Sequence, residues 1–192
     1  MVIDVYNGYI GVPAKCGSRY FAKTELITKW ETPTLLRKKF EDLSKLGLKV
    51  IIIRNPLSHL ESALQTEVME CWNDTDKIKK ILLSFSDMRL GGTHFHPQFC
   101  QRIYNIWYRD GLRIVDLSKL SEFMEEILET IPYKPSDFDF HTDSFYKSKN
   151  EVWNKCMELY PELMNELIGY TKIDTKYYNA LLNGDKNIVK LI

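Results

Sequence analysis

The sequence predicts an α/β fold with three layers, in which helices flank a mainly parallel central sheet. Short apolar runs rich in β-branched residues, at residues 48–53 and 112–116, are typical of strands buried on both faces of a parallel sheet. A segment with helical spacing of apolar residues follows each run, at residues 56–72 and 118–128, and Ser118 is suited to cap the second helix. A chain of 192 residues is long enough for one domain with a substantial core.

The N-terminal part is predicted from turn and helix-start signals. Residues 2–6 and 9–12 flank an Asn-Gly pair, which is a strong signal for a two-stranded hairpin. The second strand runs into a loop, and a helix is expected to start near Gly17. Another helix is expected over residues 33–45, because it would begin with a proline and end before a glycine.

The C-terminal part is expected to be helical. Apolar spacing predicts a helix over residues 152–160, and Pro161 either kinks it or opens a second segment that Gly169 closes. No linker or repeat divides the chain. Residues 1–192 are therefore expected to form one domain, with a helical tail at residues 171–192.

The formal net charge is zero, with 26 basic and 26 acidic side chains, but the charges are unevenly distributed. Residues 1–60 carry ten basic and five acidic side chains, whereas residues 121–192 carry eight basic and thirteen acidic ones. A protein that coats nucleic acid is normally basic overall, so no nucleic-acid partner is expected. The positive N-terminal third is suited to a local anion site.

A cytoplasmic protein without a membrane partner is expected. No stretch approaches the ~18–20 uninterrupted apolar residues of a membrane span, and the N-terminus lacks the features of a signal peptide. The four cysteines are widely spaced with no CxxC pair, which is typical of reduced, mostly buried thiols.

The loop at residues 13–19 has the composition of a phosphate or sulfate cradle. Gly17 allows the backbone to approach an anion, and the following helix N-terminus offers free N–H groups and the positive end of the helix dipole. Lys15 and Arg19 supply positive charge. The Walker A pattern is absent, because no lysine follows Gly17. A tight turn before a helix is the alternative interpretation.

A second loop, at residues 54–62, follows the buried strand. Arg54 stands at the strand end, and Ser62 lies eight positions later, less than two turns inside the helix that Pro56 is expected to open. An arginine and a hydroxyl placed in this way can hold a phosphate through charge-assisted hydrogen bonds. An ordinary ion pair of Arg54 with a carboxylate is the structural alternative.

Taken together, the two loops resemble those of the sulfotransferases that use 3′-phosphoadenosine 5′-phosphosulfate (PAPS). The family's P-[KR]-x-G-[ST]-[ST]-like loop, which binds the 5′-phosphosulfate, is similar to residues 13–19, with one extra residue between the proline and the lysine. The family's R-D-P-x-x-R-x-x-S motif, which binds the 3′-phosphate, is similar to residues 54–62. Here Asn55 replaces the aspartate and His59 replaces the middle arginine.

Two further segments add to the resemblance. Residues 93–98 resemble the H-W-x-P-Q segment of carbohydrate sulfotransferases. Residues 141–144 and 160–170 are similar to the family's H-x-x-x-S and Y-x-x-D-x-x-x-x-G-Y patterns. The resemblance spans residues 8–170 in the family's order and implies a fold like that of the P-loop NTPases.

The resemblance implies in-line transfer of a sulfuryl group from PAPS, with adenosine 3′,5′-bisphosphate (PAP) released. Lys15 would donate to the bridging oxygen as the S–O bond breaks. Arg54 and Ser62 would anchor the 3′-phosphate. The 5′-phosphate would be held by a run of backbone N–H groups that also supplies a hydroxyl and a cation: Cys16, Gly17, Ser18 and Arg19.

The acceptor side is predicted from histidines. His94 is the expected general base for a hydroxyl or amine of a carbohydrate or small molecule, with Glu25 and His96 as the next candidates. His96 and His59 are expected to contact the acceptor. His141, in an aromatic loop whose rings would stack on adenine, is expected to contact the donor.

No metal is expected, because His94, His96 and Cys100 have no convincing fourth ligand. Two alternatives stay open. A P-loop kinase would need a Mg²⁺-binding aspartate after a strand, for which Asp116 is the candidate. A nucleotide-binding module without catalysis is favoured by the short spacing of 39 positions between Lys15 and Arg54. Oligomeric state and acceptor identity stay open.

Overall fold

A computed structural model describes residues 2–5, 8–12, 16, 48–86, 113–128 and 147–184 of the chain. Within these ranges, four strands form one sheet in the order β1-β2-β3-β4. Their bounds are β1 (Val2–Val5), β2 (Gly8–Gly11), β3 (Leu48–Ile53) and β4 (Arg113–Asp116). Strand β1 is antiparallel to β2, whereas β2, β3 and β4 are parallel to one another. The predicted α/β class and the mainly parallel sheet are therefore confirmed, and the three-layer, P-loop-like arrangement stays a prediction.

Strand β3 lies between β2 and β4 and is buried as its sequence predicts. Each of its last four residues, Val50 to Ile53, is at most 1% exposed. The N-terminal hairpin is also confirmed, with one correction. Gly8 belongs to strand β2 and not to the turn, because it pairs with Val5 on one side and with Leu48 on the other.

Among the described residues, five α-helices and one short 3-10 helix accompany the sheet. They are α3 (Pro56–Met69), α4 (Thr75–Ser86), η2 (Leu117–Lys119), α6 (Leu120–Leu128), α7 (Lys149–Leu159) and α8 (Pro161–Leu182). Helix α3 begins at Pro56, as predicted, after an asparagine cap. The predicted cap of α6 is wrong, because Asp116 caps η2 by accepting a hydrogen bond from the backbone N–H of Ser118, and α6 follows.

The C-terminal prediction is right about Pro161 and wrong about Gly169. Pro161 opens a separate helix, one of the two predicted alternatives. Gly169 lies inside α8, and residues 171–182 are its second half. An internal glycine costs a helix about 1 kcal/mol, a cost that burial on both sides of it, by Leu167 and Leu181, offsets.

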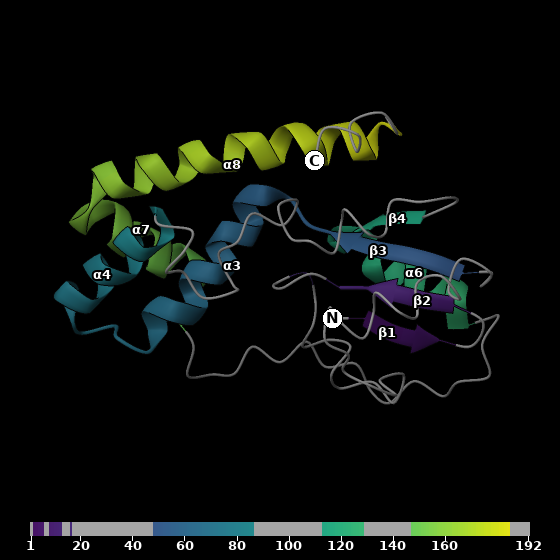
Figure 1. Cartoon of the computed structure of the whole chain (residues 1–192). Coiled ribbons are helices and arrows are strands. Elements are labelled where there is room, and N and C mark those ends of the chain that lie inside the picture. Colours follow the sequence, from purple (N-terminus) through teal and green to yellow (C-terminus); the bar gives the residue numbers. More distant parts are fainter. Residues whose placement is uncertain are drawn as a thin grey trace.

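Helices α3, α4 and α7 gather at the end of the sheet where β3 leads into α3 (Figure 1). Helix α8 starts beside this group and runs back to contact β4, while α6 lies behind the strands in the same view. An apolar core joins α3, α4, α7 and α8: Leu60, Leu64, Val68, Cys71, Ile78, Leu82, Val152, Cys156, Met164 and Leu167. Helix α4 has no counterpart among the predicted helices, although Asp74 caps its first turn through the N–H of Lys77.

Candidate functional site

The carboxyl ends of the three parallel strands lie at one edge of the sheet. Gly11 pairs with Ile51, and Ile53 pairs with Asp116, so β2, β3 and β4 end on the same side. Ligands of open α/β sheets bind outside this edge. The candidate site is therefore the group of polar side chains that follow these strand ends.

Arg54 follows directly after β3, and the first turn of α3 holds its side chain. Its Nε and Nη2 atoms donate to Oγ of Ser58, over 3.2 Å and 3.1 Å. The Asn55 side chain caps the same helix by accepting from the backbone N–H groups of Leu57 and Ser58. Asn55 thus has the capping role for which aspartate is equally suited, which explains why the Asn-for-Asp difference is compatible with this turn.

Burial lowers the pKa of the Arg54 guanidinium, and the nearby Cys16, Glu61 and Asp116 oppose that shift. A partly buried cation interacts more strongly with an arriving anion than a solvated one does, because less water screens the charges. Arg54 is the group around which an anion site at this edge would form.

The Cys16 side chain is fully buried beyond β2. Burial raises the pKa of its thiol to about 12, and the charge of Arg54 opposes that shift while Asp174 and Asp116 add to it. The thiol is therefore protonated at neutral pH and unsuited to act as a nucleophile. The burial of the thiol does not test the predicted use of the backbone N–H of Cys16 in donor binding, which stays a prediction.

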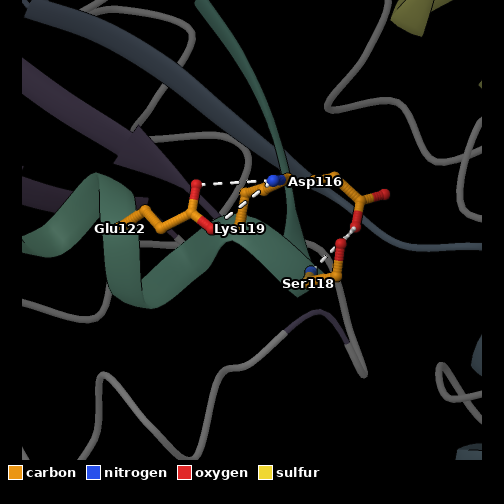
Figure 2. Close-up of polar contacts among 4 residues, drawn as sticks. All are labelled: Asp116, Ser118, Lys119 and Glu122. Carbon is orange, nitrogen blue, oxygen red and sulfur yellow. Dashed lines mark hydrogen bonds and ion pairs between the residues drawn. The ribbon is translucent and has the colours of Figure 1, made fainter.

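Asp116 ends β4, and hydrogen bonds occupy both of its carboxylate oxygens. Oδ1 accepts from the backbone N–H of Ser118 at 2.7 Å and from its hydroxyl at 2.5 Å (Figure 2). Oδ2 accepts a short hydrogen bond from the hydroxyl of Tyr178 on α8. Burial and this bond raise the pKa of Tyr178. The next residue, Lys119, pairs with Glu122 of α6 at 3.4 Å, and both side chains of this ion pair are exposed (Figure 2).

A second cation, Lys149, comes from the start of α7. Ser148 and Glu151 form a capping box there, with bonds of 3.2 Å and 2.8 Å between side chain and backbone. Gln65 of α3 donates to the carbonyl of Lys147 at 2.7 Å, which attaches this end of α7 to α3. Burial and then the positive charge of Arg54 lower the pKa of Lys149, and Glu61 opposes the shift.

Two further predicted site residues lie on α3. Ser62 is half-buried one turn after Ser58, so both hydroxyls are on the same side of the helix. His59 is 5% exposed and faces the interior, so an acceptor would reach its imidazole only if the packing around it changed. Eight of the predicted site residues lie outside the described residues: Lys15, Gly17, Ser18, Arg19, Glu25, His94, His96 and His141.

Sequence reasoning missed three residues of this edge: Ser58, Lys149 and Tyr178. Ser58 had a local signal, because it lies in the first turn of a proline-opened helix that directly follows Arg54. Lys149 and Tyr178 had none, since they reach the edge from helices far along the chain.

Comparisons with known proteins give no relative for the chain: no family model, curated protein or solved structure matches it. Within the described ranges, no helix is long and apolar enough to cross a membrane. The same ranges contain no group of three or more histidine, cysteine or acidic side chains arranged to hold a metal ion.

Proposed function

We propose that this chain is a PAPS-dependent sulfotransferase with a P-loop-like fold, acting in the cytoplasm on a hydroxyl or amine of a carbohydrate or small molecule. One observation carries the proposal. Arg54 stands at the carboxyl end of the central strand, with Ser58 on its guanidinium and Ser62 one turn further along α3. An arginine and hydroxyls at a strand-to-helix junction are suited to a phosphate group, and the resembling motif uses this junction for the 3′-phosphate of PAPS.

In the proposed reaction, an acceptor oxygen or nitrogen bonds to the sulfur of PAPS as the bond from sulfur to the bridging oxygen breaks. PAP leaves with the electron pair of that bond, and Lys15 donates a proton or hydrogen bond to the leaving oxygen. His94 takes the acceptor's proton, with Glu25 and His96 as the alternative bases. Residues 16–19 hold the 5′-phosphate, and no metal is required for these steps.

The kinase alternative is disfavoured by the surroundings of Asp116. A Mg²⁺-binding carboxylate at a strand end needs an oxygen directed toward the ion or its water shell. Here Oδ1 caps the turn at Ser118 and Oδ2 accepts from Tyr178, so both oxygens already serve the fold.

Calorimetric titration with PAP, and separately with ATP plus Mg²⁺, tests the proposal. We expect PAP to bind more tightly, and Arg54→Ala to weaken PAP binding about 10- to 100-fold, since charge-assisted hydrogen bonds are lost. Arg113→Ala is the matched control, because it removes an arginine at the opposite end of β4 and leaves the carboxyl edge intact.

Transfer of labelled sulfate from PAPS to a panel of sugars and small alcohols then tests catalysis, with Lys15→Ala expected to abolish it. A preference for ATP plus Mg²⁺ would refute the sulfotransferase proposal. PAP binding without transfer to any acceptor would instead identify a nucleotide-binding module without catalysis.

A further inference from the structure

One face of α3 points toward the start of α7. Gln65 identifies this face, because its side chain donates to the carbonyl of Lys147 at 2.7 Å. Residues three or four positions apart share a face of a helix, so Glu61 and Ser58 lie on the same side, one and two turns before Gln65. Arg54 lies at the foot of this face, bonded to Ser58.

Lys149 is the first residue of α7 and is half-buried where α7 packs against α3. The charge of Arg54 acts on Lys149 across this contact, and Glu61 acts on both cations. Two cations and one carboxylate therefore share a partly buried region at the carboxyl edge of the sheet. The charge of Asp116 also acts on Arg54, but both oxygens of that carboxylate already accept hydrogen bonds, from Ser118 and Tyr178.

We propose that Lys149 is the second cation of the Arg54 anion site and that Glu61 is the internal counter-charge that balances the two cations when no anion is bound. The ligand class is a phosphate monoester. Its identity as the 3′-phosphate of a nucleotide rests on the function proposed above, whereas the anion site itself does not.

The physical reason is that like charges repel strongly where water is partly excluded. An anion that enters between Arg54 and Lys149 relieves this repulsion and gains two charge-assisted contacts. Glu61 relieves the same repulsion in the unliganded protein, but it repels the entering anion. Removing Lys149 and removing Glu61 are therefore expected to change anion binding in opposite directions.

Four proteins test this inference: the wild type, Lys149→Gln, Glu61→Gln, and the control Lys79→Gln, which removes an exposed cation on α4, beyond the far end of α3. The affinity for PAP is measured by calorimetry at low ionic strength, and the melting temperature is measured with and without inorganic phosphate. Lys149→Arg is added as a rescue variant that keeps the charge.

We expect Lys149→Gln to weaken PAP binding about tenfold with little change in the melting temperature of the unliganded protein. Lys149→Arg should stay within about threefold of the wild type, because the charge is kept. Glu61→Gln should tighten binding roughly three- to tenfold and lower the unliganded melting temperature, because two cations are left facing each other. A residue with only a structural role would instead change affinity and stability in the same direction.

The inference is overturned if Lys149→Gln binds PAP as Lys79→Gln does, or if Glu61→Gln weakens binding. If the wild type ignores PAP but is stabilised by inorganic phosphate, the sulfotransferase proposal fails alone, and the phosphate-induced melting shifts of the same variants decide the inference. If the wild type responds to neither probe, both proposals fail.

Discussion

The helical core and the carboxyl edge of the sheet differ in their side chains: the core is apolar, whereas charged groups gather at the edge. The core shared by α3, α4, α7 and α8 is a cluster of leucine, isoleucine, valine, methionine and cysteine side chains. The edge, by contrast, places Arg54 and Lys149 in partly buried surroundings, with the charge of Asp116 close enough to act on Arg54. Buried apolar surface stabilises a fold, whereas charges withdrawn from water generally cost free energy. The difference suits the core to stability and the edge to the anion binding proposed above.

Truncating a side chain of the core is expected to have the largest effect on the free energy of unfolding. Leu64→Ala removes a fully buried side chain from α3, and we expect a loss of about 2–5 kcal/mol in the free energy of unfolding. The variant that remains folded should keep its affinity for PAP. Urea unfolding measures the loss, and Leu83→Ala is the control, because Leu83 is 44% exposed and should change stability by under about 1 kcal/mol.

Tyr178→Phe tests whether the edge also contributes to stability. The change removes the hydroxyl that donates to Oδ2 of Asp116, and with it the hydrogen bond between the second half of α8 and the end of β4. We expect a loss of about 1–2 kcal/mol in urea unfolding, since a hydrogen bond to a charged group is lost in a partly exposed place. A loss as large as that of Leu64→Ala would contradict the division between core and edge.

The Cys16 thiol predicts a pH dependence of stability. Its folded pKa is raised from 9.0 to about 12, so the folded state keeps the proton while the unfolded state releases it. Stability is therefore fully present below about pH 9 and decreases by about 1.4 kcal/mol per pH unit above it. Unfolding measured between pH 8 and pH 10.5 should show this decrease in the wild type and a weaker one in Cys16→Ala. Equal slopes would refute the prediction.

The smallest effect is expected where a cation rests on the helical core. Lys155 lies 4.1 Å from the ring centre of Trp72 and donates to its carbonyl at 2.6 Å. Lys155→Met keeps much of the apolar stem and should cost about 0.5–1 kcal/mol in thermal unfolding. PAP binding should be unchanged, unlike in Lys149→Gln. A matching loss of affinity would show that α7 as a whole, and not Lys149, controls the site.

The sequence predicts the local elements of this protein well where short-range chemistry decides them. The β-branched run of β3 and the Asn-Pro start of α3 need no distant partner, so the placement of Arg54 at a strand-to-helix junction was predictable. Gly169 misled the prediction because burial along α8 outweighs the local preference of one glycine. Helix α4 was missed although its aspartate cap is a recognisable signal.

The sequence by itself determined the sheet's central strand, the helix that follows it, and the positions of Arg54 and Ser62 at their junction. Only the tertiary structure decided which distant groups meet that cation. Lys149 lies near Arg54 because Gln65 attaches the start of α7 to α3 through a hydrogen bond that spans 82 positions of the chain. The hydrogen bond of Tyr178 to Asp116 spans 62 positions. Local spacing and propensity carry no information about such contacts, since they depend on how whole helices pack.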